Sequence, residues 1–246
     1  MTTVAISQPM YFPWAGFMEM MKLADVFVWL DDVQFSKGSF TNRIQVKTQT
    51  GVKWMTIPLQ GKGTNTPIRD LVGAGDDWRR SHRAMLTHAL AAAPCLAKAL
   101  EVFDDARAPS GLSEVLIRSC EAQARLMAAM PGKIVRIGEL DIGGVSWPRV
   151  IEIVKAVGGS RYISGAGGAN YLDHAAFDRQ GLSVEYMAYN PLPWPQQHGE
   201  FTPYVTGLDL IAACGAGSAD HLRPVTIPWR ERLAQPRVAD EGANHE

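Results

Sequence analysis

The sequence predicts an α/β protein with a mainly parallel central sheet, an added β-hairpin and a helical subdomain. Three observations lead to this prediction. Short apolar runs have the character of strands that are covered on both faces of a parallel sheet. Segments whose apolar residues recur at helical spacing separate these runs. One further stretch alternates apolar and polar residues on both sides of a Gly-containing connection, which indicates a hairpin.

The chain opens with a strand, a helix and a second strand. Residues 4–7 form the first strand, and the continuous apolar run at 26–30 forms the second. Between them, residues 15–24 carry an apolar stripe at helical spacing. Pro9 and Pro13 keep the segment before this helix out of regular structure. The three elements are expected to form a βαβ unit.

The next part of the chain predicts the hairpin and the helical subdomain. Residues 43–48 and 53–59 alternate apolar and polar side chains, with the turn expected at 49–52. Residues 78–103 and 112–130 are rich in Ala, Leu and Arg and have a helical pattern. We therefore expect a helical insertion over about 76–130.

The rest of the chain returns to the sheet. Further strands are expected at 134–137, 161–164 and 182–189, and a helix at about 148–157 that ends at two glycines. We treat residues 1–230 as one α/β domain. The polar residues 231–246 are expected to be a disordered tail.

The composition narrows the class of partner. A formal charge of −1 provides no bulk attraction to nucleic acid or to an anionic membrane. No apolar run is long enough to cross a bilayer, and the N-terminus has no signal-peptide pattern. The three cysteines are widely spaced, and no H-x-x-x-H pair suggests zinc, so we expect free thiols, no metal site and a cytoplasmic location. Cofactors and oligomeric state stay open.

The loop after the first strand is the first candidate site. Gln8 places a polar group at the strand end, and Gly16 lies where free amides at a helix start attract anions. Alternatively, Tyr11 and Trp14 simply pack the loop onto the sheet. The layout is similar to the opening βαβ unit of nucleotidyltransferases and class I synthetases. Their H-x-G-H signature is matched only by 14–17, which lacks both His, so adenylyl transfer is not expected.

Two carboxylates follow the second strand directly. Asp31 and Asp32 are suited to bind a metal, orient a sugar hydroxyl or act as a general base. Alternatively, they form a solvated pair or an ion pair with Lys37 or Arg43. Because adjacent strand residues point to opposite faces, we expect one carboxylate in the pocket and favour Asp32.

Two more segments carry possible phosphate ligands. Asn42 and Arg43 offer a fork of donors at the start of the hairpin, with Lys47 on the same face as Arg43. A plain solvated face is the alternative. Later, a strand enters a Gly-rich loop that contains Gly165 and Gly168, and this loop is either a backbone cradle for phosphate or a tight turn. In the polar and aromatic loop at 194–203, His198 could act as a general base, but a lone His is more often structural.

Taken together, these segments resemble the WbqC-like protein family over about residues 4–215. The matching residues are Gln8-Pro9, Tyr11, Pro13-Trp14, Gly16-Phe17, 24–28, 30–34, 37–40, Asn42-Arg43, Lys47-Thr48, 162–165, Gly168, 171–173, Gly181, Pro195-Gln196, Phe201, Pro203, 208–210 and Gly215. Two departures stand out. Ser7 occupies the place of an expected His, and Thr206-Gly207 replace an expected Ser, so neither position is expected to be catalytic.

The resemblance implies an enzyme of nucleotide-sugar and O-antigen-type or other surface-polysaccharide biosynthesis. We expect a transferase acting on a nucleotide-linked or phosphorylated sugar, with Asp32 or Asp31 as base. The ligand-binding residues expected are Gln8, Tyr11, Trp14, Gly16, Lys37, Asn42, Arg43, Lys47, Ser164, Gly165, Gly168, Tyr171 and Gln196. One alternative is a non-catalytic binding or scaffold protein. Another is an aminoacyl-tRNA-dependent transferase, which a basic patch of Arg79, Arg80, Arg83 and Lys98 would favour; nucleic acid is otherwise not an expected partner.

Overall fold

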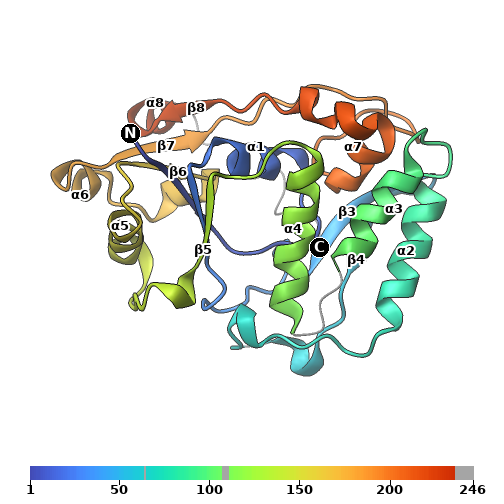
Figure 1. The fold of residues 1–246 in the computed structure, drawn as a ribbon, viewed down its shortest axis with the longest axis horizontal. Coiled ribbons are helices and arrows are strands. Elements are labelled where there is room, and N and C mark those ends of the chain that lie inside the picture. Colours follow the sequence, from blue (N-terminus) through green and yellow to red (C-terminus); the bar gives the residue numbers. More distant parts are fainter. Residues whose placement is uncertain (64, 107–110, 236–246) are drawn as a thin grey trace.

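A six-stranded sheet lies on one side of the molecule, and a hairpin with several helices lies on the other (Figure 1). This computed structural model describes residues 1–63, 65–106 and 111–235. The sheet has the order β5-β2-β1-β6-β7-β8, in which the first five strands are parallel and the last is antiparallel. The strands are β1 (Thr3–Ser7), β2 (Val26–Trp29), β5 (Lys133–Arg136), β6 (Arg161–Ser164), β7 (Ser183–Met187) and β8 (Thr226–Pro228). The predicted fold class is confirmed.

Both faces of the sheet are covered. In β1, Ala5 belongs to the core that contains α1 (Ala15–Leu23). The neighbouring Val4 belongs to the core that contains α5 (Ser146–Ala156) and α6 (His174–Arg179). Successive side chains of a strand point to opposite faces, so a strand between two helical layers needs apolar residues throughout. This explains the continuous apolar runs in the sequence.

The hairpin forms a separate two-stranded sheet of β3 (Arg43–Thr48) and β4 (Gly51–Thr56). The expected four-residue turn is wrong, because the connection is only Gln49 and Thr50. Gly51 follows with φ of 98°, a left-handed conformation that glycine adopts without strain, and the second strand therefore resumes at once.

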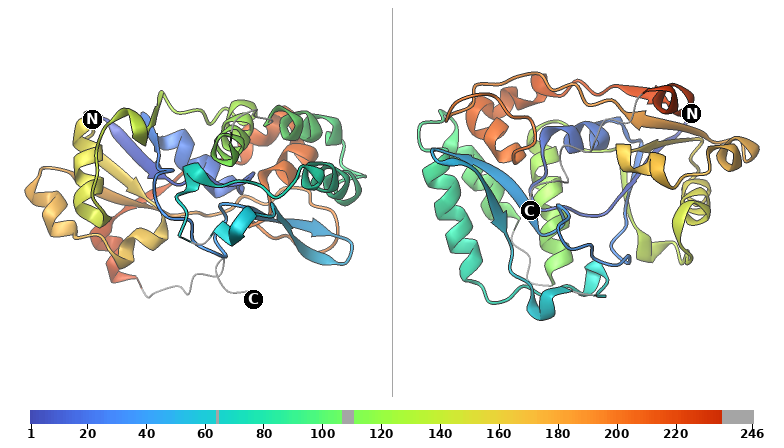
Figure 2. Two further views of the ribbon diagram at one scale, coloured as in Figure 1. Left: turned by 90° about the horizontal axis from the view of Figure 1, so that it is seen from below. Right: turned by 180° about the vertical axis from the view of Figure 1, so that it is seen from behind.

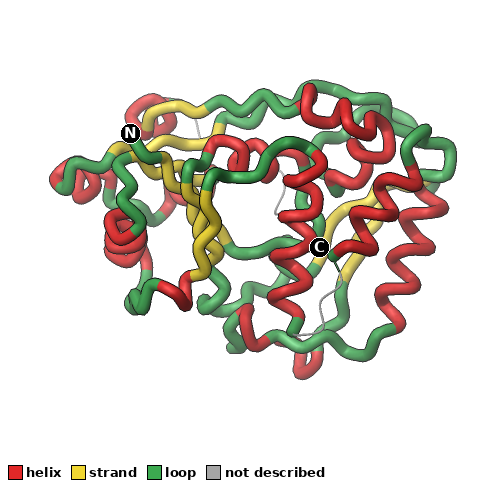
Figure 3. Tube along the Cα trace, in the orientation of Figure 1, coloured by secondary structure: helices red, strands yellow, loops and turns green. Residues whose placement is uncertain are grey.

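Helices pack around the hairpin to form the second region of the molecule (Figure 2). They are α2 (Asp77–Ala89), α3 (Leu96–Asp105), α4 (Leu112–Leu126) and α7 (Gly207–Cys214), with short 3-10 turns η1 (Gln60–Gly63) and η2 (Ile68–Asp70) before them. The chain leaves the sheet after β2 and returns at β5, so the hairpin and helices α2–α4 form one long excursion. Loop segments make up much of the connection between the two regions (Figure 3).

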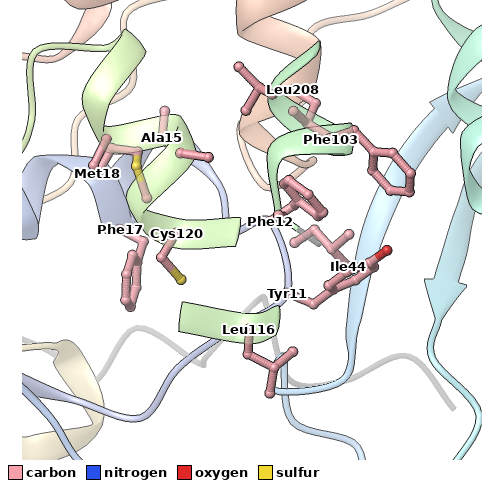
Figure 4. Close-up of a cluster of buried hydrophobic side chains, with 14 of the residues drawn as sticks. Tyr11, Phe12, Ala15, Phe17, Met18, Ile44, Phe103, Leu116, Cys120 and Leu208 are labelled. Atoms are coloured by element: carbon pink, nitrogen blue, oxygen red, sulfur yellow. The ribbon is translucent and has the colours of Figure 1, made fainter. Parts of the chain in front are cut away.

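The loop after β1 runs into the core of this second region. Phe12 stacks on Phe103 of α3 with ring centroids 5.2 Å apart. Tyr11 lies beside Ile44 of β3 and near Leu116 of α4 (Figure 4). The rings of Tyr11 and Phe12 are both fully buried. The loop therefore ties the sheet to the helical region.

Three C-terminal elements were not expected from the sequence: α7, β8 and α8 (Trp229–Ala234). Helix α7 is short and buried on nearly all sides, so it lacks the amphipathic pattern that reveals a surface helix. The expected tail at 231–246 begins inside α8, and residues 236–246 lie outside the described residues. Within the described part of the chain, no helix combines the length and apolar character needed to cross a membrane.

Candidate functional site

The sheet reverses its strand order between β1 and β6. Numbered along the chain, the five parallel strands have the spatial order 3-2-1-4-5, so the connections after β1 and β6 run to opposite sides. In open α/β sheets, ligands bind in the crevice outside the carboxyl ends of the strands at such a point. Gln8 and Gly165 are the first residues beyond β1 and β6 there. This carboxyl edge is therefore the candidate site.

Two glycines of the loop after β6 have different roles. Gly168 lies in the 3-10 turn η4 (Ala166–Asn170), where a Cβ would stand 2.1 Å from Oγ of Ser164. Gly165 is exposed, and a Cβ there would meet no atom within 4 Å. Gly168 is therefore required by packing, whereas Gly165 leaves the backbone open to close approach by a ligand.

Two tyrosine hydroxyls, those of Tyr162 and Tyr171, interact beside this loop. Tyr162 of β6 is buried, and burial raises its pKa well above the ordinary value. Tyr171 is half-exposed, and partial burial of its hydroxyl also raises its pKa. Both phenols are therefore protonated at neutral pH, and Tyr171 can offer a neutral hydroxyl to a ligand.

Asp31 and Asp32 turn to opposite sides of the sheet edge. Oδ2 of Asp31 accepts a hydrogen bond from Oγ of Ser113 at 2.8 Å, in the first turn of α4. Oδ2 of Asp32 accepts one from the buried guanidinium of Arg149 in α5 at 2.5 Å. Asp32 thus pairs with a cation, but this is Arg149 rather than the exposed Lys37. Across the described residues, no group of three His, Cys, Asp or Glu side chains could hold a metal ion.

Arg149 is a residue that sequence reasoning missed. It also donates to the carbonyl oxygen of Ile142, so its guanidinium joins three parts of the chain. One feature of the sequence could have indicated its role. A cation in the first turn of a helix is disfavoured by the helix dipole, so its presence at the start of α5 indicates a carboxylate partner.

Asn42 and Arg43, where the hairpin begins, form hydrogen bonds to nearby backbone carbonyl groups. The Asn42 amide is buried and donates to the carbonyl oxygen of Ile57 at 2.8 Å. The Arg43 guanidinium lies 4.0 Å above the ring of Trp54 and donates to the carbonyl oxygen of Gly38 at 2.5 Å. Asn42 is therefore fixed by the fold, while Arg43 is a half-exposed cation on an aromatic face.

Lys47 and Gln196 meet in a separate polar cluster. The buried ammonium of Lys47 donates to Oε1 of Gln196 at 3.1 Å and to the carbonyl oxygen of Gly199 at 3.1 Å. Asp209 lies nearby and accepts from Nε1 of Trp194 at 2.6 Å, and burial raises the pKa of this carboxyl group. These bonds fasten the loop before α7 to β3. The hydrogen bonds described for this cluster do not reach the carboxyl edge.

A row of half-buried aromatic rings links the loop after β1 to the hairpin. Trp14 lies 4.9 Å from Phe40, and Phe40 lies 5.7 Å from Trp54, measured between ring centroids. A Cβ at Gly16 would stand 2.9 Å from atoms of both Trp14 and Tyr189. Aromatic packing therefore accounts for this glycine, in the space where the sequence suggested a ligand.

Tyr11 belongs to a buried relay of hydrogen bonds. Nε2 of His82 lies 3.1 Å from the carbonyl oxygen of Thr56, which can only accept, so Nε2 carries the proton. Nδ1 of His82 therefore accepts from the Tyr11 hydroxyl at 3.0 Å. Burial lowers the pKa of His82 to about 4 and raises that of Tyr11 well above its ordinary value. Both side chains are neutral at pH 7.

Carboxylates neutralise most of the basic residues that would favour a tRNA partner. The ion pairs are Arg80 with Asp77, Arg83 with Asp104, and Lys98 with Glu101. Arg79 instead lies 4.5 Å above the ring of Trp78 and has no ion pair with a described residue. Such a charge-balanced surface is a weak match for a polyanion.

The strand order and the helices on both faces of the sheet define a doubly wound α/β protein. The WbqC-like protein family matches residues 8–221, and the chain belongs to this family. The uncharacterized protein Rv1507c of Mycobacterium tuberculosis (strain ATCC 25618 / H37Rv) is 29% identical over 231 residues, which cover 91% of this chain and 98% of that protein. No solved structure matches the chain. The resemblance inferred from the sequence is confirmed.

Proposed function

We propose that the protein binds a nucleotide-linked or phosphorylated sugar at the carboxyl edge and modifies it as a transferase. The reversal of strand order between β1 and β6 carries this proposal. Nucleotides bind at this position in doubly wound sheets, because the loops leaving the two strands diverge and open a crevice. Gln8, which is half-buried, and Gly165, whose backbone is exposed, come directly after these two strands.

The proposed base is a carboxylate of the Asp31–Asp32 pair. The second oxygen of Asp31, Oδ1, makes no hydrogen bond with a described residue. Oδ2 of Asp32 is paired with Arg149, and its Oδ1 is buried. We expected Asp32 from the sequence, but these contacts favour Asp31 for accepting a proton from the acceptor amine or hydroxyl. Asp32 and Arg149 then fix the loop that carries Asp31.

The aromatic row supplies a further part of the proposed site. Half-buried rings such as Trp14 and Trp54 can stack on a base or a sugar through their exposed parts. Arg43 uses one guanidinium donor on Gly38, and the remaining donors of its fork suit a phosphate. The row begins in the loop that leaves Gln8, which favours a ligand extending from the crevice toward the hairpin.

The proposed setting is surface-polysaccharide biosynthesis of the O-antigen type, which the family resemblance implies. The name of the mycobacterial relative states no activity. The donor group and the acceptor sugar are therefore to be found by experiment.

Calorimetric titration with UDP-, GDP- and dTDP-linked sugars tests the binding step. We expect saturable binding to at least one of them, weakened by Gln8→Ala and by Gly165→Ala with unchanged melting temperatures. Gly217→Ala is the matched control, because it also adds a Cβ that meets no atom within 4 Å, but in η5 (Gly215–His221). Absence of binding across the panel, or binding that both site variants leave intact, would reject the proposal.

A second candidate function is binding without catalysis, as in a scaffold protein. The observation that favours it is that each carboxylate of the pair has a structural partner, Ser113 for Asp31 and Arg149 for Asp32. A ligand that binds and is recovered unchanged, with Asp31→Asn altering neither affinity nor product, would support this function over a transferase.

A further inference from the structure

A cavity with a volume of about 1040 Å³ lies between α2 and α3, beside the loop after β1. This size is in the range of cavities that hold small organic ligands. Its inner wall is aromatic and aliphatic: Tyr11, Phe12, Trp78, Phe103, Ala106 and Val115. None of the described residues that line it is Gln8, Asp31, Asp32 or Gly165, so it is separate from the carboxyl edge.

The inner wall is mostly apolar, and its Tyr11 hydroxyl is already engaged in a hydrogen bond. The Tyr11 hydroxyl donates a hydrogen bond to Nδ1 of His82, and the N–H of His82 donates one to the carbonyl oxygen of Thr56. The rings of Phe12 and Phe103 are stacked and add only apolar surface. A ligand would therefore direct an apolar or aromatic part inward.

The rim carries charge, and one cation there is not neutralised by a described carboxylate. Arg80 pairs with Asp77, and Arg83 pairs with Asp104, so these two arginines are already matched. Arg79 lies over Trp78 without an ion pair to a described residue, and its charge acts on Tyr11 at the inner wall. The carboxylate of Asp76 also lines the cavity, but it is exposed and therefore screened by water.

We propose that this cavity binds a small aromatic carboxylate, with its ring against Trp78 and Phe103 and its anionic group on Arg79. A guanidinium that already lies on an aromatic face is well placed to bond a carboxylate. The stacked and edge-on rings offer the geometry that aromatic ligands prefer. The proposal is independent of the function proposed for the carboxyl edge.

A pair of fluorescent probes tests this site. 8-Anilinonaphthalene-1-sulfonate has an aromatic body and an anionic group that stands in for the carboxylate, and N-phenyl-1-naphthylamine is its neutral counterpart. We expect saturable binding of the anionic probe to the wild type. Arg79→Leu should weaken it about tenfold, as for a lost hydrogen bond between charged groups, and should leave the neutral probe unaffected.

Two further variants complete the test. Lys98→Leu, on the neighbouring helix α3, is the matched control, because it also removes one exposed cation but does not line the cavity; it should change neither affinity. Ala84→Trp, from an exposed position on α2 that lines the cavity, should fill the space and abolish binding of both probes. Melting temperatures and near-UV circular dichroism establish that each variant is folded.

Three results would overturn the proposal. The first is an anionic probe that binds the wild type and Arg79→Leu equally. The second is an equal loss in Arg79→Leu and Lys98→Leu, which would show general attraction to a basic surface. The third is binding that survives in folded Ala84→Trp, which would place the probe elsewhere. If Arg79→Leu does not fold, Arg79→Gln and Ala84→Trp decide the same question.

Discussion

The carboxyl edge of the sheet and the α2–α3 cavity are built in different ways. At the edge, Gln8, Asp31 and Gly165 each come directly after a parallel strand or one residue later, so the strand order brings them together. In the cavity, the central hydrogen bond joins Tyr11 and His82, which are 71 positions apart. The edge is therefore a product of backbone topology, and the cavity is a product of helix packing.

The carboxyl edge and the cavity also differ in how their ionisable groups are stabilised. At the edge, the Asp32 carboxylate forms an ion pair with a cation from α5. Around the cavity, burial holds Tyr11 and His82 in their neutral forms. Substitutions at the edge should therefore change function, whereas changes of pH should act on the stability of the helical region. The following predictions test this difference, from the largest expected effect to the smallest.

The largest effect is expected at Asp31. In an assay of group transfer to a nucleotide-linked sugar, Asp31→Asn should lower the rate by about 10²–10⁴-fold, because it removes the proposed general base and keeps its shape. Asp32→Asn should retain more activity, because that carboxylate is occupied by Arg149. Loss of turnover in Asp32→Asn with turnover kept in Asp31→Asn would reverse the assignment.

His82 should make stability depend on pH. Its pKa is about 4 in the folded protein and about 6.5 in the unfolded chain, so between these values the unfolded chain binds the extra proton. The free energy of unfolding should therefore fall as pH drops from 6.5 to 4, by on the order of 3 kcal/mol from this group. Urea unfolding at several pH values measures the effect.

The control for His82 is His82→Gln, which cannot take up the proton. The carboxyl groups of Glu19 and Asp209, whose pKa values are raised by burial, contribute with the opposite sign in both proteins. The prediction therefore concerns the difference between the two pH profiles. Identical slopes for wild type and His82→Gln would show that His82 does not carry the effect.

Arg43 tests whether the aromatic row belongs to the edge site. Arg43→Ala should weaken binding of a nucleotide-linked sugar by about 1.5–3 kcal/mol, as expected for a lost hydrogen bond to a charged group. Lys53→Ala removes a cation from the opposite face of the hairpin and should change affinity little. Equal affinities for wild type and Arg43→Ala in a calorimetric titration would separate the hairpin from the site.

The smallest effects are expected for substitutions of Gly165 and Gly168, the two glycines after β6. They distinguish a glycine required by packing from one left open for a ligand. Gly168→Ala should destabilise the protein by about 1–3 kcal/mol, because its Cβ would clash with Ser164. Gly165→Ala should leave the free energy of unfolding within about 0.5 kcal/mol of the wild type, because its Cβ meets open space. Denaturant unfolding compares them, and an equal cost for both would contradict the distinction.

Local pattern was enough to predict most of the sheet and its carboxyl edge. The strands β1, β2, β5 and β6 and helix α1 were expected within about two residues of their observed bounds, because apolar periodicity depends only on near neighbours. The positions of Gln8, Asp31 and Gly165 followed from where those strands end. Glycine was less informative, since Gly16 and Gly168 are explained by packing.

By itself, the sequence determined the α/β class, the family and the polar residues that follow the strands. Only the tertiary structure decided which distant groups meet: Arg149 with Asp32, Lys47 with Gln196, and Tyr11 with His82. Such pairs lie between 71 and 149 positions apart. The physical reason is that a local pattern shows which side of an element is apolar, whereas the segment that covers it is selected by the packing of the whole chain.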